Sequence, residues 1–208
     1  IYLRLYGLFK ETTMMTQPVP VAVVGAGNMG SNHIRVFDQL PSAEMVEVVE
    51  PESDRASDVR EKYDVRVLDS VDDIERARAA TVAIPNRLHR SMSKRLLERG
   101  IGVLVEKPLA PSVDEAREIV DTAAAYDTLL QVGHIERFNP AVELLVDILS
   151  DQEIIAAEAH RLGPFNEHLS DTDVVFDLMV HDLDIADILF DGSVRSIQAM
   201  GACPRSSQ

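Results

Sequence analysis

Short apolar runs alternate with amphipathic stretches along the chain from Val19 to Gly133. The apolar runs are short and rich in valine, which predicts buried strands of a parallel sheet at Val19–Val24, Met45–Val49, Ala80–Ile84, Gly102–Val105 and Leu129–Val132. The stretches between them predict helices at Met29–Gln39, Ser53–Tyr63, Val71–Arg78, His89–Arg99 and Val113–Tyr126. Because strands and helices alternate, we expect βαβ units and an α/β domain built on a doubly wound parallel sheet.

The pattern changes after Gly133. It predicts a helix from Asn139-Pro140 to about Leu149, followed by a strand at Glu153–Arg161 and a polar loop at Gly163–Thr172. A second helix at Val174–Phe190 and a second strand at Val194–Met200 follow. This is the start of a second α/β unit with too few strands for a well-covered sheet, so we expect a C-terminally truncated chain. The expected organisation is a non-native or disordered segment at 1–17, a first domain at 18–137 and a partial second domain at 138–208.

Charge and composition exclude several classes of protein. A net charge of −15 argues against nucleic acid and against an anionic membrane surface as partners, and no apolar run reaches the roughly 18 residues of a membrane helix. The single cysteine, Cys203, permits no internal disulfide and suits a cytoplasmic protein. Acidic residues are abundant and lysines few, which is typical of salt-loving cytoplasms, where salt screens self-repulsion. The alternative is an ordinary acidic surface.

Three glycines stand in G-x-G-x-x-G spacing between the first strand and the first helix. Gly25 allows a tight turn, Gly27 lets the backbone approach a pyrophosphate, and Gly30 permits close packing of helix on strand. The next strand ends at Glu50, whose carboxylate is placed to bind ribose hydroxyls and favours NAD, although the nearby Arg55 leaves NADP binding open. These features predict a Rossmann domain, with a nucleotide-free α/β fold as the alternative.

Three further motifs accompany the glycine turn: Ala83-Ile-Pro-Asn-Arg-Leu-His89, Glu106-Lys-Pro108 and Asp177-Leu-Met-Val-His-Asp-Leu-Asp184. Together they resemble the Gfo/Idh/MocA family of sugar and polyol oxidoreductases, over Pro18 to about Gly201. Residues 132–140 and 173–184 resemble in particular its archaeal UDP-N-acetylglucosamine 3-dehydrogenase type. The resemblance implies a Rossmann domain followed by a substrate domain whose larger sheet commonly forms the subunit interface, and hence a homo-oligomer if the chain were full length.

The resemblance also implies catalytic roles for Lys107, His181 and Asp177, and it implies that Lys107 contacts the nicotinamide region of the cofactor as well. A lysine ammonium stabilises the alkoxide that develops as a secondary alcohol is oxidised, and histidine takes the hydroxyl proton near neutral pH. In an α-helix, Asp177, His181 and Asp184 would share one face. The alternatives for this polar row are a solvated helix face and a metal site, and we expect no metal.

Other residues are expected to surround the cofactor and the substrate. The cofactor set adds residues of the glycine loop and of two strand ends, namely Asn28, Met29, Pro85, Asn86, His89 and Glu106. For His89, local capping or packing is an equal alternative. Arg137, Asn139 and Asp184 are candidate substrate ligands, with a domain-hinge role as the alternative for Arg137 and Asn139. His33 is expected to be structural, and His134, His160 and His168 are open candidates for the cleft.

These observations together predict NAD-dependent oxidation of a secondary hydroxyl group on a sugar or nucleotide sugar. The preferred substrate is UDP-N-acetylglucosamine or a close relative, oxidised at its 3-hydroxyl. Two alternatives remain open. The first is an enzyme of the same family that acts on inositol, a free aldose or biliverdin, and the second is a catalytically inactive NAD-binding fragment.

Overall fold

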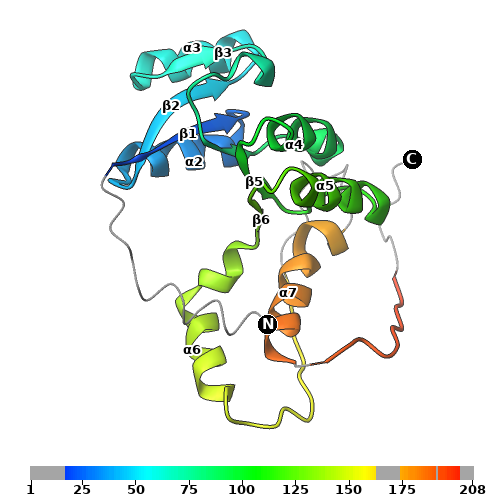
Figure 1. The fold of residues 1–208 in the computed structure, drawn as a ribbon. Coiled ribbons are helices and arrows are strands. Elements are labelled where there is room, and N and C mark those ends of the chain that lie inside the picture. The colour runs from blue at the N-terminus through cyan, green and yellow to red at the C-terminus, as the bar shows by residue number, and fades with distance from the viewer. Residues whose placement is uncertain (1–16, 163–173, 191, 202–208) are drawn as a thin grey trace, which may run out of the picture. The chain divides into compact units, whose positions relative to one another are not determined.

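The computed structural model describes residues 17–162, 174–190 and 192–201. Its contacts divide the chain into two compact units, Ile1–His134 and Ile135–Gln208 (Figure 1). The expected domain boundary at residue 137 lies close to this division. Residues 1–16, the polar loop expected at 163–172, His168 and Cys203 lie outside the described residues.

Six parallel strands form the sheet of the first unit, in the order β3-β2-β1-β4-β5-β6. They are β1 (Val19–Val24), β2 (Ala43–Val49), β3 (Arg66–Leu68), β4 (Ala79–Val82), β5 (Gly102–Glu106) and β6 (Leu130–Gly133). The order reverses at β1, which confirms the predicted doubly wound sheet. The five predicted strands are all present, whereas β3 was missed because three residues are too few to show a periodic pattern.

Both faces of the sheet are buried, which explains its valine-rich strands. Neighbouring side chains on a strand point to opposite faces. On the central strand β1, Val23 packs in a cluster with Ile34 of the following helix, whereas Val24 packs in the other cluster with Leu96 and Ile119. Val23 is fully buried and Val24 nearly so, as expected for a parallel sheet covered by helices on both sides.

Four α-helices cover the sheet: α2 (Asn28–Gln39), α3 (Ser53–Lys62), α4 (His89–Leu97) and α5 (Val113–Ala125). All four were predicted. Two of them begin at a side chain that accepts hydrogen bonds from otherwise unpaired backbone N–H groups. Glu52 accepts from two such groups at the start of α3, and Ser112 accepts from Glu115 at the start of α5.

The helix predicted at Val71–Arg78 is wrong, because only the short 3₁₀ helix η1 (Val71–Asp73) forms there. The carboxylate of Glu47, which is fully buried on β2, accepts hydrogen bonds of 3.1–3.2 Å from the backbone N–H groups of residues 75–77. Arg66 pairs with the same carboxylate at 3.4 Å. These bonds satisfy the N–H groups that a helix would have used, so the segment instead runs directly into β4.

The regular elements in the described part of the second unit are all helices. It contains the 3₁₀ helix η3 (Ile135–Phe138), α6 (Pro140–Leu149), a π-helical turn η5 (Val175–Met179) and α7 (Val180–Leu189). Asn139 caps α6 by accepting a 3.0 Å hydrogen bond from the N–H of Ala141, and Pro140 occupies the first turn, where no N–H is needed. The helix predicted at Val174–Phe190 therefore forms, but its first turn is π-helical.

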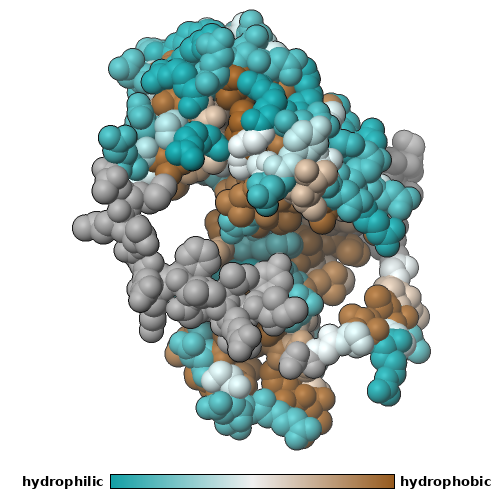
Figure 2. Space-filling view, in the orientation of Figure 1, coloured by the Kyte–Doolittle hydropathy of each residue, from teal (hydrophilic) through white to brown (hydrophobic). Residues whose placement is uncertain are grey.

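The strands predicted at Glu153–Arg161 and Val194–Met200 are wrong, since both segments are irregular. Their alternating pattern is real, but a strand needs a hydrogen-bonded neighbour, and none of the described strands pairs with either segment. Apolar side chains of the second unit lie exposed over α6 and α7 (Figure 2), including those of Leu144, Ile148 and Leu183. No helix in the described part of the chain is both long and apolar enough to span a bilayer.

Candidate active site

The glycine turn between β1 and α2 has no space for side chains at two of its three glycines. Gly25 has a φ of +92°, which disfavours any other residue, and a Cβ there would lie 2.6 Å from the Ala83 carbonyl oxygen. A Cβ at Gly30 would overlap the Gly25 carbonyl oxygen. The first glycine thus makes the turn, and the third brings α2 against it, as the sequence predicted.

Gly27, in contrast to the other two glycines, has space for a side chain. A Cβ there would meet no atom within 4 Å, so the backbone at this position faces open space. Gly27 is also the N-cap of α2, which has neither a side-chain cap nor an acidic residue in its first turn, and Asn28 and Met29 are exposed. Uncapped N–H groups and the positive end of the helix dipole favour an anion. The residues present therefore fit the pyrophosphate of a dinucleotide.

Glu50 lies at the end of β2 and joins the glycine turn to α3. Its buried carboxylate accepts hydrogen bonds from the N–H groups of Ala26 at 2.8 Å and Glu52 at 3.0 Å, and from the Arg55 guanidinium at 3.0 Å. Burial by itself raises the pKa of Glu50, but the hydrogen bonds from Arg55, Ala26 and Glu52 outweigh it and lower the pKa below its ordinary value. Oε2 accepts a single one of these bonds, which leaves a lone pair for the predicted ribose contact.

The lowered pKa of Glu50 predicts that the folded state loses stability at acidic pH. A carboxyl group whose folded-state pKa lies below the ordinary 4.5 stabilises the fold above that pH and loses this contribution as the pH falls through the folded-state pKa. We expect Glu50→Gln to lower the free energy of unfolding at pH 7 by about 1–3 kcal/mol and to flatten its decline below pH 4.5. Urea unfolding at several pH values measures both. Glu61→Gln, at an exposed position of α3, is the control, and an unchanged acid slope in Glu50→Gln would contradict the assignment.

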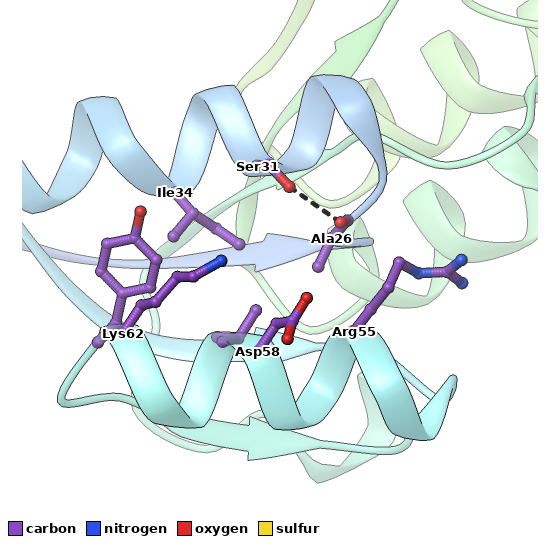
Figure 3. Close-up of a pocket in the computed structure, with 8 residues that line it drawn as sticks. Ala26, Ser31, Ile34, Arg55, Asp58 and Lys62 are labelled. Atoms are coloured by element: carbon purple, nitrogen blue, oxygen red, sulfur yellow. Dashed lines mark hydrogen bonds between the residues drawn. The ribbon is translucent and has the colours of Figure 1, made fainter.

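A pocket of about 100 Å³ lies between α2 and α3 beside this turn. Figure 3 shows Arg55, Asp58 and Lys62 on α3 facing Ser31 and Ile34 on α2. The Arg55 guanidinium lies 3.0 Å from the Glu50 carboxylate and 3.7 Å from that of Glu52. Arg55, the residue that left NADP binding open in the sequence, is thus paired with two carboxylates.

Lys107 follows β5 at the same carboxyl edge of the sheet as the glycine turn. Its half-buried side chain is preceded by Glu106, and the Lys107-Pro108 peptide bond is cis. His33 Nε2 on α2 lies 2.7 Å from Glu106 Oε1. Burial tends to raise the pKa of Glu106, but the hydrogen bond and charge of His33, together with the N–H and charge of Lys107, outweigh it and lower the pKa.

His89 begins α4 in the interior of the first unit. It is 1% exposed, and its ring nitrogens lie 2.9 Å from the Pro108 carbonyl oxygen and 2.8 Å from the Ile84 carbonyl oxygen. Of the two alternatives open from the sequence, this geometry favours local packing over direct contact with the cofactor. Pro85 and Asn86, at the start of the 3₁₀ helix η2 (Asn86–Leu88), are more accessible at the end of β4.

In the second unit, two of the predicted substrate ligands bind each other. The Arg137 guanidinium donates two hydrogen bonds to the buried Asp184 carboxylate, one of them 2.8 Å long. Asn139 caps α6 and donates to the Glu136 carboxylate at 3.1 Å. This pairing links η3 to α7, so the contact of Arg137, Asn139 and Asp184 with a substrate stays a prediction.

The pairing of Arg137 with Asp184 separates Asp184 from the other two residues of the predicted polar row, Asp177 and His181. Asp177 lies in the π-helical turn η5, where α-helical spacing does not apply, and His181 lies in the first turn of α7. Both are half-buried, whereas Asp184 is buried against Arg137. The described residues contain no group of three or more His, Cys, Asp or Glu side chains that could hold a metal ion.

Sequence reasoning missed several pairings because the partners are far apart in the chain. His33 and Glu106 are 73 residues apart, and no local pattern joins them. Arg161 donates three hydrogen bonds to Asp182, the neighbour of His181, and lowers the pKa of that carboxyl group. His160 lies on the surface and contacts Glu158 at 2.9 Å.

Residues 19–134 match the family model described as "Oxidoreductase family, NAD-binding Rossmann fold", which covers more than half of the chain. The chain belongs to the Gfo/Idh/MocA family. Its first unit is therefore an NAD-binding Rossmann domain, and the sequence-based expectations of this family, fold and cofactor are confirmed.

Several Gfo/Idh/MocA proteins resemble the chain over most of its length. The UDP-N-acetylglucosamine 3-dehydrogenase of the bacterium Acidithiobacillus ferrooxidans is 29% identical over 184 residues, which are 86% of this chain and 56% of that enzyme. A crystal structure of the same enzyme, GnnA, superposes with a TM-score of 0.74 at 28% identity, covering 83% of this chain and 56% of that one. Inositol 2-dehydrogenase 1 of Paenarthrobacter aurescens is 30% identical over 93% of this chain and 60% of its own length.

A complex with bound ligands extends this comparison. The WlbA dehydrogenase of Bordetella pertussis, solved with NADH and UDP-GlcNAcA, superposes with a TM-score of 0.62 at 25% identity, over 66% of this chain and 40% of that one. The chain spans somewhat more than half the length of the curated relatives described above. The sequence motifs suggested an archaeal type of 3-dehydrogenase, but the 3-dehydrogenase that this chain resembles is a bacterial enzyme.

Proposed function

We propose that the protein is an NAD-dependent dehydrogenase that oxidises a secondary hydroxyl group of a sugar or nucleotide sugar. One observation carries this proposal. Lys107 follows β5 at the carboxyl edge that also bears the glycine turn, and the 2.7 Å contact between Glu106 and His33 ties its loop to α2. Ligands of doubly wound sheets bind at this edge. A lysine at this edge lies beside the place where the dinucleotide is proposed to bind.

The proposed chemistry needs two groups of this chain in addition to the cofactor. When bound, NAD⁺ accepts the hydride. The ammonium group of Lys107 stabilises the negative charge that develops on the substrate oxygen, and the imidazole of His181 takes the hydroxyl proton. Asp177 is proposed to orient that imidazole. One hydride and one proton then leave the alcohol, and a ketone remains.

The relatives support two substrate classes. The A. ferrooxidans protein is named a UDP-N-acetylglucosamine 3-dehydrogenase, and the WlbA dehydrogenase was solved with a nucleotide sugar, which together favour a nucleotide sugar oxidised at its 3-hydroxyl. The inositol 2-dehydrogenase of P. aurescens, at 30% identity, supports a cyclic polyol as the second candidate. Both substrates present a ring secondary alcohol, so the same pair of groups serves either one.

A substrate panel followed by NADH absorbance tests the proposal. The purified chain is mixed with NAD⁺ and, in turn, UDP-N-acetylglucosamine, UDP-glucose, myo-inositol and a free aldose, and NADH binding is measured separately by fluorescence. We expect NADH formation with UDP-N-acetylglucosamine and little with the free aldose. Normal NADH binding without turnover of any of these substrates would contradict the dehydrogenase assignment.

A further inference from the structure

Two histidines from different helices contact the residues on either side of Lys107. His33 on α2 contacts Glu106, and His89 at the start of α4 contacts Pro108. The two helices begin at the ends of different strands, since α2 follows the glycine turn after β1 and α4 follows the loop after β4. The short segment that carries Lys107 therefore contacts two helices, and these helices follow the loops at the ends of β1 and β4.

The contact with His33 holds the Glu106 carboxylate in a confined place. Besides His33 Nε2, this carboxylate accepts a hydrogen bond from the backbone N–H of Lys107 itself. A Cβ at Gly133, the last residue of β6, would lie 3.3 Å from Glu106 Oε2, so the glycine leaves space for the carboxylate. Glu106 thus connects α2, through His33, to the backbone of Lys107.

The contact with His89 is buried and has acceptors on both sides. The Pro108 and Ile84 carbonyl oxygens both face the ring, and a carbonyl only accepts, so the ring donates from whichever nitrogen carries the hydrogen. Because His89 is 1% exposed, water does not compete for these contacts. The ring therefore lies between the loop after β4 and the loop after β5, within hydrogen-bonding distance of a carbonyl oxygen in each.

We propose that His33 and His89 are positioning residues that clamp the Glu106–Pro108 segment and thereby fix the Lys107 ammonium relative to the bound cofactor. This inference rests on the proposed function for the role of Lys107. His33 links Lys107 to the helix whose N-terminus fits the pyrophosphate, and His89 links it to the loop that carries Asn86. Neither histidine touches the substrate in this proposal.

Substitutions at His33, which is half-buried, test the first side of the clamp. His33→Leu removes the ring nitrogen that contacts Glu106, whereas the amide of His33→Gln places a donor near the position of Nε2. In His33→Leu we expect faster hydrogen–deuterium exchange at the Lys107 amide and a kcat lowered by about 10- to 100-fold, with KM and the NADH dissociation constant changed little. His33→Gln should restore much of both properties. Asn32→Leu, at an exposed neighbour on α2, is the matched control.

The buried ring is tested by a pair of variants that each keep one contact. His89→Asn keeps a donor near the Nδ1 position toward Pro108, and His89→Gln keeps one near the Nε2 position toward Ile84. We expect the Lys107 amide to exchange more slowly, and turnover to be faster, in His89→Asn than in His89→Gln. Thermal melts identify any variant that fails to fold, in which case the His33 variants decide.

The outcomes separate this inference from the proposed function. If His33→Leu folds and shows wild-type exchange at Lys107 and wild-type kcat, the clamp is wrong even though the enzyme is active. If the wild-type protein binds NADH and turns over none of the substrates in the panel, the proposed function fails. The exchange measurement needs no substrate, so it still reports whether the histidines hold the segment.

Discussion

Lys107→Ala is expected to lower kcat by about two to four decades while the affinity for NADH stays within a few-fold of wild type. The reason is that the proposed ammonium group interacts with charge that develops on the substrate oxygen in the transition state and is absent before the reaction. His181→Ala is expected to have an effect of similar size, because without the imidazole the hydroxyl proton must pass to water.

The measurements that check this prediction are initial rates with the preferred substrate and NADH binding by fluorescence. Lys94→Ala is a control within the same unit, since Lys94 lies on α4 and pairs with Glu118 at 3.1 Å. The double variant Lys107→Ala/His181→Ala should lose far less than the sum of the single losses, as groups that act on one alcohol are not additive. Full turnover in Lys107→Ala would eliminate the proposed mechanism.

Gly30→Ala is expected to destabilise the Rossmann domain and to weaken NADH binding at least tenfold. The added methyl group overlaps the Gly25 carbonyl oxygen, so α2 must move away from the turn, and overpacking of this kind costs about 1–3 kcal/mol. Movement of α2 displaces the N–H groups that fit the pyrophosphate. Thermal melting and an NADH titration measure the two effects.

Gly27→Ala is the matched comparison for Gly30→Ala. Its methyl group meets no protein atom within 4 Å, so the fold should melt close to wild type. The same methyl group occupies the space through which a pyrophosphate approaches the backbone, so NADH binding should still weaken. A Gly27→Ala protein that binds NADH normally would show that the pyrophosphate does not pass this close to the turn.

Local patterns predicted the first unit well, for identifiable reasons. The valine runs at β1 and β5 predicted strands because both faces of a parallel sheet are buried. The glycine spacing predicted the turn because a positive φ at Gly25 and the approach of Gly30 to Gly25 are local properties. The helix at Val71–Arg78 failed because its N–H groups bind Glu47, a residue of another strand. The two strands of the second unit failed because alternation does not provide a pairing partner.

Pairings between distant residues were decided only by the tertiary structure. His33 with Glu106, His89 with Pro108 and Arg137 with Asp184 join residues 73, 19 and 47 positions apart. The order of residues along the chain therefore determined five of the strands in the first unit, the glycine turn and the types of chemical group available. Which groups meet was left to the packing of helices on the sheet, because hydrogen bonds between distant residues depend on three-dimensional distance, which no periodicity along a chain encodes.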